Sequence, residues 1–292
     1  MRGKHRNAVS AWLQPEPTNW WHVVDDAIEE DVGSGDLTSG CIDPEQTSRF
    51  YIEVQGDGVI CGLGIAEYLL TPYPSDPDGC GLATLSTDGD LVERGQRVCE
   101  GNLPTRRVLM AERTLLNFMM HLSGVATLTR HFVDKVQGTK ARITDTRKTI
   151  PTLRSLQKYA VRCGGGHNHR MGLFDGVLLK DNHIAATGGI RSTIARVRDY
   201  APHLVKIEVE CTSIEQVDEA VEAGADVILL DNMDPFMMRD AVKKYEGRVV
   251  FEASGGISHD TVRGVAQTGV DLISLGMLTH SAPALPMHLE LA

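Results

Sequence analysis

The sequence lacks the signatures of several protein classes. Its 292 residues contain no apolar run near the ~20 residues that span a bilayer, and residues 1–20 show neither the apolar core nor the cleavage pattern of a secretory signal. None of the six cysteines forms a C-x-x-C pair, which disfavours a zinc site or redox motif. The formal net charge of −10 argues against nucleic acid as the main partner. We therefore expect a cytoplasmic protein without nucleic-acid or membrane partners, whose thiols are free and mostly buried.

The first third of the chain predicts a mixed α/β region. Residues 1–20 are expected to form a loose leader, and the proline-rich residues 72–81 a surface loop. The longest helical pattern covers 108–136, with a break expected near Gly124. The remaining patterns predict helices over 20–30 and 65–70 and strands over 50–54 and 58–61.

From residue 141 onward, short apolar strands alternate with amphipathic helices. The expected strands cover 142–144, 176–179, 205–209, 227–230, 249–251 and 272–275. The expected helices between them cover 152–161, 190–200, 214–223, 237–245 and 261–268. Successive βα units of this length imply parallel strands with helices outside, although the strands are fewer than those of a complete (β/α)₈ barrel.

Polar groups at the strand ends favour a barrel over an open sheet. Arg147 and Lys148 follow the first strand, Lys180 the second, Glu210 the third and Asp231 the fourth. Barrel enzymes build their sites at the C-terminal ends of several strands, whereas an open sheet concentrates such groups at one crevice. We therefore predict an α/β barrel whose mouth gathers these side chains, with Arg147 and Lys180 buried at strand ends.

A local excess of cations lies between residues 145 and 183. Seven basic side chains face three acids there, a sum of 7 − 3 = +4 in a protein of net charge −10. Such a field inside an acidic protein favours a small, highly charged anion as the ligand. The basic residues are Arg147, Lys148, Arg154, Lys158, Arg162, Arg170 and Lys180.

Part of this cationic stretch is suited to bind carboxylates. Arg147, Arg170 and Lys180, together with His169, form the candidate clamp, because guanidinium binds carboxylate in a bidentate geometry. The alternative for each cation is a solvated surface charge, and it is strongest for residues on the 152–161 helix such as Lys158. Lys180 also fits a Schiff-base aldolase, although bound anions would keep its ammonium protonated.

Carboxylates and glycines supply further candidate groups. Glu210 and Asp231 end neighbouring strands, so their oxygens are expected to bind Mg²⁺ or sugar hydroxyls, and Glu208 points the same way as Glu210. The loops after the last two strands are expected to bind phosphate through backbone N–H groups, with simple turns as the alternative. These loops contain Ser254, Gly255 and Gly256, and Leu275, Gly276 and Met277.

The long cationic stretch closely resembles that of the quinolinate phosphoribosyltransferases, the carboxylating enzymes of NAD biosynthesis. The resemblance is carried by Asp145-Thr146-Arg147-Lys148-Thr149, by the run from Gly164 to Arg170, and by Leu179 to His183. It continues through Glu208-Val209-Glu210, Leu230-Asp231-Asn232 and Ser254-Gly255-Gly256. Thr152 is a departure, since the family usually has glycine after Pro151.

That resemblance implies the architecture and the assembly. It implies an incomplete, seven-stranded α/β barrel over residues 117–279. It also implies an N-terminal α/β sandwich domain formed by residues 1–116 and completed by the tail, 280–292. The expected assembly is a homodimer, or a larger oligomer, in which each site takes Arg113 from its neighbour.

The resemblance also implies the roles of single residues. The two carboxylates of quinolinate would be held by Arg147, His169, Arg170 and Lys180. Phosphoribosyl pyrophosphate would be handled by the catalytic residues Lys148, Glu210 and Asp231, and its Mg²⁺ would be bound by Glu210 and Asp231. The 5-phosphate would lie at Ser254, Gly255, Gly256 and Gly276, and the substrate site would also include Arg113, Thr146, Leu275 and Met277.

The expected reaction transfers phosphoribosyl to quinolinate with decarboxylation, which gives nicotinate mononucleotide, pyrophosphate and CO₂. Three alternatives stay open at this point. They are a related barrel phosphoribosyltransferase for another pyridine or base, a Schiff-base lyase that uses Lys180, and a barrel that only binds a phosphorylated metabolite.

Overall fold

A computed structural model describes residues 20–71 and 81–292. The expected leader lies outside the described residues except for Trp20, and so does the expected 72–81 loop except for Gly81. The chain divides into two compact units. The first unit comprises Met1–Arg130, Thr149–Gly165 and Leu278–Ala292, and the second comprises His131–Lys148 and Gly166–Met277. Across the described ranges, no helix combines the length and the apolar character needed to cross a membrane.

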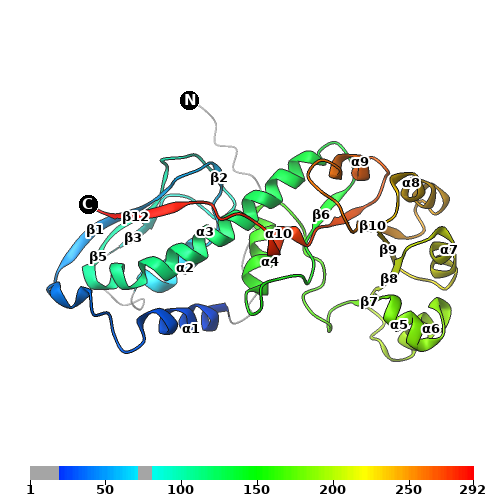
Figure 1. Cartoon of the computed structure of the whole chain (residues 1–292), viewed down its shortest axis with the longest axis horizontal. Coiled ribbons are helices and arrows are strands. Elements are labelled where there is room, and N and C mark those ends of the chain that lie inside the picture. The colour runs from blue at the N-terminus through cyan, green and yellow to red at the C-terminus, as the bar shows by residue number, and fades with distance from the viewer. Residues whose placement is uncertain (1–19, 72–80) are drawn as a thin grey trace. The chain divides into compact units, whose positions relative to one another are not determined.

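An antiparallel sheet with the strand order β12–β1–β5–β3 lies in the first unit. The strands are β12 (Met287–Leu291), β1 (Thr47–Val54), β5 (Arg97–Pro104) and β3 (Leu82–Thr84). Phe50, Ile52 and Val54 alternate along β1 and are buried, as expected for a strand with one face on a core. Figure 1 shows β12, from the end of the chain, alongside β1.

The first unit also contains several helices and a short ladder. They are α1 (Trp20–Val32), η2 (Ser39–Cys41), β2 (Gly58–Val59), α2 (Leu63–Leu70), β4 (Leu91–Val92) and α4 (Arg154–Cys163), with β2 paired to β4. The Oδ1 atom of Asp88 accepts hydrogen bonds of 3.0 Å from the backbone N–H groups of Gly62 and Leu63 and so caps α2. The helices predicted over 20–30 and 65–70 are confirmed, with small shifts in their ends.

The helix α3 (Thr105–Lys135) runs through 31 residues without interruption, so the expected break near Gly124 is wrong. A Cβ atom at Gly124 would lie 2.1 Å from the carbonyl oxygen of Pro283. The backbone N–H of Leu285 donates to the carbonyl of Met120 at 3.0 Å, on the same part of the helix. Glycine at this position therefore makes room for the C-terminal tail and does not end the helix.

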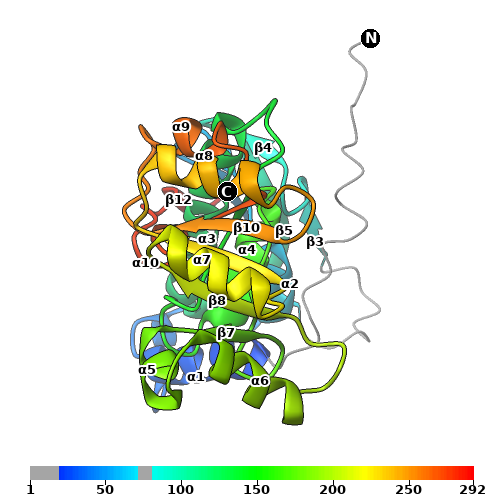
Figure 2. The ribbon, with the colours of Figure 1, turned by 90° about the vertical axis from the view of Figure 1, so that its right-hand side faces the viewer.

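A parallel sheet with the strand order β6–β11–β10–β9–β8–β7 forms the second unit. The strands are β6 (Arg142–Thr144), β7 (Val177–Leu179), β8 (Ile207–Cys211), β9 (Val227–Asp231), β10 (Val250–Ser254) and β11 (Leu272–Ser274). Each was predicted from its apolar run, with ends displaced by up to three residues. In both ribbon views the helices α5 to α8 lie on one face of this sheet (Figures 1 and 2).

The helices that connect successive strands are α5 (Asp181–Thr187), α6 (Ile190–Tyr200), α7 (Ile214–Glu222), α8 (Pro235–Lys244) and α9 (Val262–Ala266). The short helix α10 (Met277–His280) follows the last strand of the sheet, β11. Ile190, Ile194 and Val197 recur at helical spacing in α6 and are buried, which is why this helix was predictable. The helix α5 was not predicted, because all seven of its described residues stay outside the core and give no apolar stripe.

The seventh strand implied by the resemblance is reduced to one bridge. Thr144 and His167 form an isolated parallel bridge. The His167 N–H donates to Ile143 O at 2.8 Å, and the Asp145 N–H donates to His167 O at 3.2 Å. These bonds place the segment that begins at His167 beside β6. No ladder joins β7 to β6 within the described part of the chain, so the sheet is an unclosed barrel wall.

Candidate active site

Glu210, Asp231 and Ser254 lie on one face at the C-terminal end of the parallel sheet. Glu210 pairs with Leu229, and Ser254 pairs with Asp231. Since Leu229 and Asp231 are two residues apart on β9, they face the same side, and so do their partners on the neighbouring strands. The structure therefore brings together the carboxylates and the serine that the sequence placed at successive strand ends.

Lys180 joins this row through an ion pair. Its Nζ lies 2.5 Å from Oε2 of Glu210, with the lysine side chain about half exposed and the glutamate mostly covered. The backbone N–H of Lys180 also donates to Nδ1 of His183 at 3.0 Å, which fixes the start of α5. This geometry serves an ammonium group and not the free amine that Schiff-base formation needs.

The segment from His167 to Arg170 is anchored by a buried carboxylate. Asp145 is fully buried directly after β6. Its Oδ1 accepts the backbone N–H of His169 at 2.9 Å, and its Oδ2 accepts the Asn168 side-chain N–H at 2.6 Å. Asp145 thus holds the segment against the sheet. This structural role is not evident from the sequence.

Both ring nitrogens of His169 are within hydrogen-bond distance of protein atoms. The backbone N–H of Arg170 donates to Nδ1 at 2.7 Å. Nδ1 must therefore present a lone pair, so the ring hydrogen lies on Nε2. Nε2 is 2.9 Å from Oε2 of Glu208 and 3.8 Å from Oε1 of Glu252. His169 consequently donates to Glu208, inside the sheet.

Glu208 and Glu252 form a buried carboxylate pair beside His169. Their side chains are 9% and 2% exposed. The Oε1 atom of each finds no hydrogen-bond partner among the residues that the structure describes. Burial, and then the charge of Glu208, raise the pKa of Glu252 to about 7, against the lowering effects of His169 and a hydrogen bond with Ser274.

Arg170 points into a cavity of about 230 Å³ that His169, Glu208 and Glu252 also line. One of its terminal N–H groups (NH1) donates to Gly176 O at 2.8 Å. Its buried Nε, by contrast, is left without a partner in the described part of the chain. Burial, followed by the charge of Arg147, lowers the pKa of Arg170. Arg170 is therefore held by its backbone N–H and by one guanidinium nitrogen. Its Nε–H remains able to donate a further hydrogen bond.

Arg147 and Lys148 follow β6 as predicted, but the expected burial is wrong. Arg147, Lys148 and Lys180 are all exposed. Thr146, which precedes them, accepts the Lys148 backbone N–H at 2.9 Å through its hydroxyl. The strands end before these residues begin, so their long side chains are exposed, and that of Lys180 turns to Glu210.

The glycine-rich loop after β10 has a backbone conformation that favours glycine. Gly255 and Gly256 have φ angles of 86° and 59°. A Cβ at Gly255 would lie 2.3 Å from Oδ1 of Asn232. Asn232 N–H in turn donates to Ser254 O at 2.9 Å, so the loops after β9 and β10 are locked together. After β11, Leu275 N–H donates to Thr144 O at 3.0 Å and orients Gly276 and Met277.

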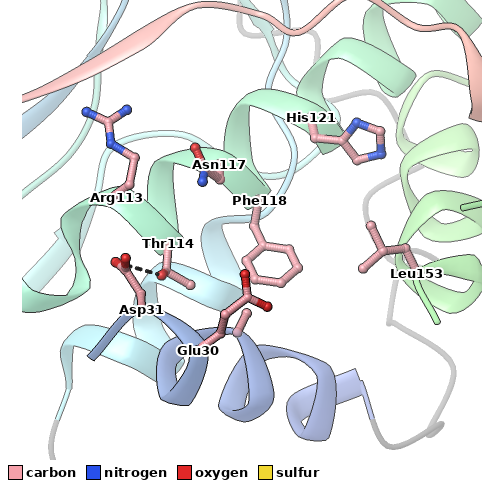
Figure 3. A pocket seen from close by; sticks show the side chains of 9 residues that line it. Glu30, Asp31, Arg113, Thr114, Asn117, Phe118, His121 and Leu153 are labelled. Atoms are coloured by element: carbon pink, nitrogen blue, oxygen red, sulfur yellow. Dashed lines mark hydrogen bonds between the residues drawn. The ribbon is translucent and has the colours of Figure 1, made fainter. Parts of the chain in front are cut away.

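Arg113 belongs to the first unit, on α3, and lines a pocket there, with its guanidinium directed away from Glu30 and Asp31 (Figure 3). Figure 3 shows Arg113 and Asn117 on one face of α3, across from Glu30 and Asp31 of α1. The pocket holds about 250 Å³. The Thr114 hydroxyl donates to Oδ2 of Asp31 at 3.5 Å. Arg113 is exposed, so its guanidinium is available for a partner beyond this pocket.

The donor chemistry of Glu210 and Asp231 fits a magnesium ion. Mg²⁺ is commonly bound by one or two carboxylates together with phosphate oxygens of a substrate. Both carboxylates are partly exposed at the end of the sheet, on the same face as Ser254. The residues present are therefore compatible with the predicted ion.

The described cysteines are all free, as expected. Cys61, Cys99, Cys163 and Cys211 are buried and Cys41 is exposed, while Cys80 lies outside the described residues. The Sγ atoms of Cys61 and Cys163 are 3.6 Å apart, and burial raises the pKa of the Cys61 thiol well above its usual value. Cys163 is thus a buried wall residue beside the glycine run, not an accessible nucleophile.

Lys158 shows where sequence reasoning misjudged exposure. It lies on α4, where a solvated surface charge was the stronger alternative, but the residue is only 1% exposed. Glu252 and Asp145 were also not given roles. The signal for Glu252 was its position two residues before Ser254, which places both side chains on the same face of β10.

Comparisons with known proteins identify the family of this chain. Residues 36–123 match the family model described as the quinolinate phosphoribosyl transferase N-terminal domain, and residues 125–290 match its C-terminal domain. The chain is 42% identical over 270 residues to the nicotinate-nucleotide pyrophosphorylase [carboxylating] of Mycobacterium leprae, which covers 91% of this chain and 94% of the relative. It is also 42% identical over 261 residues to the probable enzyme of that name from Bacillus subtilis, with 89% of each chain covered. A crystal structure of the nicotinate-nucleotide pyrophosphorylase from Ehrlichia chaffeensis superposes with a TM-score of 0.89 at 37% identity, over 95% of this chain and 100% of the other.

Proposed function

Since this chain belongs to the quinolinate phosphoribosyltransferase family, we propose that it transfers the phosphoribosyl group of phosphoribosyl pyrophosphate to quinolinate. The products are nicotinate mononucleotide, pyrophosphate and CO₂. One observation carries most weight: Lys180, Glu210, Asp231 and Ser254 meet at one end of the parallel sheet. This end of the sheet therefore combines three kinds of group: a cation that can bind carboxylates, oxygen donors that can bind a metal ion, and a glycine-rich loop.

The quinolinate carboxylates are bound by Arg147, Arg170 and Lys180. Arg170 supports this assignment best, because its buried Nε lacks a partner among the described residues and lines a cavity. A carboxylate would satisfy that donor and the remaining guanidinium N–H groups. Nicotinate, with one carboxylate, would satisfy fewer of these cations. His169 lies beside Arg170 and belongs to the same proposed carboxylate-binding group, as the family resemblance implies.

Phosphoribosyl pyrophosphate is bound by Lys148, Glu210 and Asp231 and by the glycine-rich loops. The positive φ angles of Gly255 and Gly256, which follow Ser254, support a phosphate contact, since a glycine-rich turn after a strand can direct its backbone N–H groups toward an anion. Gly276 at the end of β11 offers a second such contact. Glu210 and Asp231 would hold Mg²⁺, which when bound neutralises charge on the pyrophosphate.

The chemistry needs positioning more than proton transfer. The bond between ribose C1 and the pyrophosphate oxygen breaks, and the pyridine nitrogen of quinolinate forms a new bond to C1. The side chains that hold both substrates supply the orientation for this step. The positive charge on the alkylated nitrogen then stabilises the carbanion left at C2 when that carboxylate departs as CO₂, and a proton from solvent bonds to C2.

Arg113 completes the site of a second copy in a homodimer. It lies in the first unit, whereas Arg147, Arg170 and Lys180 lie in the second. Its exposed position supports a contact outside its own pocket. An Arg113→Ala chain mixed with an Arg147→Ala chain would then regain activity, because one hybrid site in each mixed dimer has both arginines.

Product identification by mass tests the proposal. The protein is incubated with quinolinate, phosphoribosyl pyrophosphate and Mg²⁺, and nicotinate mononucleotide and pyrophosphate are expected in equal amounts. Replacement of quinolinate by nicotinate should reduce turnover strongly. No product from quinolinate, or equal turnover of both pyridines, would contradict the proposal. Borohydride trapping of a substrate on Lys180 would favour the lyase instead.

A further inference from the structure

The side-chain amide of Gln157, on α4, is buried and makes three hydrogen bonds. Its Oε1 accepts the backbone N–H of Ile150 at 2.9 Å. Its Nε2 lies 2.6 Å from the carbonyl oxygen of Thr279 and 2.9 Å from Nε2 of His121. All four residues belong to the first unit. A buried amide with these partners fixes the segments that it joins, because a partner left without a bond would be costly.

The two backbone partners determine the orientation of this amide. The Ile150 N–H can only donate, so it must face the amide oxygen, and the Thr279 carbonyl can only accept, so it must face the NH₂ group. The second hydrogen of the NH₂ group then points to His121, whose Nε2 accepts it. A rotation of the amide by half a turn would set two donors against each other at Ile150 and two acceptors at Thr279. Gln157 therefore has one orientation in which every bond is made.

The backbone groups that Gln157 binds lie just beyond two loops of the proposed site. Ile150 follows Lys148 by two residues, after the strand β6. Thr279 follows Met277 by two residues, in the helix α10 after the strand β11. The first loop contains cations proposed to bind both substrates, and the second contains a glycine proposed to bind the 5-phosphate. One neutral side chain therefore anchors the ends of two loops that the proposed function assigns to substrate binding.

The starts of the same two loops are anchored separately, by the sheet of the second unit. The strands β6 and β11 pair in parallel, with Thr144 opposite Ser274. The contact extends one residue further, since the Leu275 N–H donates to Thr144 O at 3.0 Å. Each loop is thus held at both ends, by the sheet where it begins and by Gln157 where it ends. A loop that is already ordered has less conformational freedom to lose when it binds a ligand.

We propose that Gln157 is a positioning residue, whose amide fixes the ends of the loops after β6 and β11 and so places Lys148 and Gly276 for phosphoribosyl pyrophosphate. Arg147, in the first loop, is placed with Lys148 and binds quinolinate. Gln157 acts through the backbone of its partners, and a displacement of about 1 Å in a group that binds substrate can cost about 100-fold in rate. This inference deepens the proposed function and rests on it for its kinetic consequences.

Two substitutions of Gln157 separate the two loops. Gln157→Glu keeps an oxygen for the Ile150 N–H, loses both donors and repels the Thr279 carbonyl, so it releases the end of the second loop alone. KM for phosphoribosyl pyrophosphate should rise about tenfold, while KM for quinolinate should stay within about twofold of the wild type. Gln157→Met keeps a similar length and loses all three bonds, so both KM values should rise about tenfold.

Ser123→Ala is the matched control, because it also removes buried hydrogen bonds within the first unit. The buried Ser123 hydroxyl accepts the Cys61 N–H at 2.9 Å and donates to Cys61 O at 3.1 Å. Urea unfolding should show a loss of stability, and both KM values should stay within about twofold of the wild type. The inference would be wrong if Ser123→Ala raised KM as strongly as the Gln157 variants do. It would also be wrong if both KM values were unchanged in Gln157→Met, or rose equally in Gln157→Glu.

Hydrogen exchange tests the anchoring without turnover. Ile150 is exposed and lies outside every helix and strand, so its N–H should exchange fast unless Gln157 holds it. In isoleucine-labelled protein, the nitrogen-15 NMR signal that disappears in Ile150→Val should exchange slowly in the wild type and in Gln157→Glu. It should exchange at least about tenfold faster in Gln157→Met.

The exchange result also separates this inference from the proposed function. Fast exchange of the Ile150 N–H in the wild type would overturn the inference, and this measurement needs no variant to fold. Slow exchange in a folded Gln157→Met protein would overturn it as well. Absence of turnover in a wild type whose Ile150 N–H exchanges slowly would instead contradict the proposed function and leave the anchoring by Gln157 supported.

Discussion

The Nζ atom of Lys180 lies 2.5 Å from Oε2 of Glu210, so the residue that precedes α5 is tied to the C-terminal part of β8. Lys180 is proposed to bind quinolinate, and Glu210 is proposed to bind the magnesium and phosphoribosyl group. On that proposal, the ion pair joins the two substrate regions. A substrate carboxylate at Lys180 would compete with Glu210, and Glu210 would then be free to bind Mg²⁺.

Lys180→Met tests this link. The variant keeps the length of the side chain and removes its charge, so we expect KM for quinolinate to rise about 10- to 100-fold. Lys244→Met removes a comparable exposed pair, Lys244 with Asp218 at 2.7 Å on the helices α8 and α7, and should leave both KM values unchanged. Steady-state kinetics with each substrate varied in turn measures the difference. Equal effects of the two variants would show that Lys180 has no special contact.

Gly255→Ala tests the phosphate loop. The φ angle of 86° and the 2.3 Å approach to Asn232 oppose any side chain at this position. We expect KM for phosphoribosyl pyrophosphate to rise at least about tenfold, because the loop backbone must shift away from the phosphate. Gly95→Ala has a similar φ of 84° but open space around it, so it controls for backbone strain alone. A similar KM in both variants would argue against phosphate binding at Gly255.

Gly124→Ala tests the contact between α3 and the tail. A Cβ atom 2.1 Å from Pro283 O forces the tail to move, and we expect the free energy of unfolding to fall by about 1–3 kcal/mol, the usual cost of overpacking. Gly264→Ala lies in the helix α9 with no atom within 4 Å of the added Cβ, so it should be neutral or stabilising by about 0.5–1 kcal/mol. Urea unfolding of both variants checks the opposite signs.

Thr152→Gly should stabilise the protein. Thr152 has a φ angle of 69°, which is strained for a β-branched residue, and glycine relieves this strain at some cost in unfolded-state entropy. We expect a net gain of about 0.5–1 kcal/mol in the free energy of unfolding. Thr84→Gly, at an exposed position of β3, should instead lose about 0.5–1 kcal/mol. A loss in both variants would show that Thr152 is not strained.

The pH dependence of stability should carry the signature of Glu252. Its pKa is about 7 in the folded protein against a usual value of 4.5. Between these values the folded state keeps a proton that the unfolded state releases, so the free energy of unfolding falls as pH rises through this window. Glu252→Gln removes the titration, and its stability should fall less between about pH 5 and about pH 8. Parallel curves for wild type and variant would contradict the assignment.

The positions of the strand ends can be predicted from the sequence, but the side-chain contacts between distant segments cannot. Glu210 and Asp231 each end an apolar run, and this local pattern is enough to place them at one end of a parallel sheet. The bond between His169 and Glu208 joins two segments far apart in the chain, and no local pattern reports it. The number of strands came from the resemblance, whereas the reduction of one strand to the Thr144–His167 bridge depends on hydrogen bonds that only the structure shows.

Single residues mark the other limits of prediction. A glycine in a helical pattern has two explanations, a break or a close neighbour, and at Gly124 the neighbour came from a segment more than 150 residues away. The predicted burial of Arg147 and Lys180 is wrong because both residues lie beyond the last residue of their strands, where long side chains are exposed. The helix α5 escaped detection since it buries none of its described residues and so lacks an apolar stripe.

The pairing of β12 with β1 has a consequence for synthesis of the chain. Residues of β1 leave the ribosome before the parallel sheet is made, yet their neighbours on one edge, from Met287 to Leu291, are made only after it. During translation the edge of β1 must therefore wait uncovered while the whole parallel sheet is produced, a period in which an exposed strand edge invites association between nascent chains. Ribosome-bound intermediates that end before Met287 should consequently recruit chaperones more strongly than released chains do.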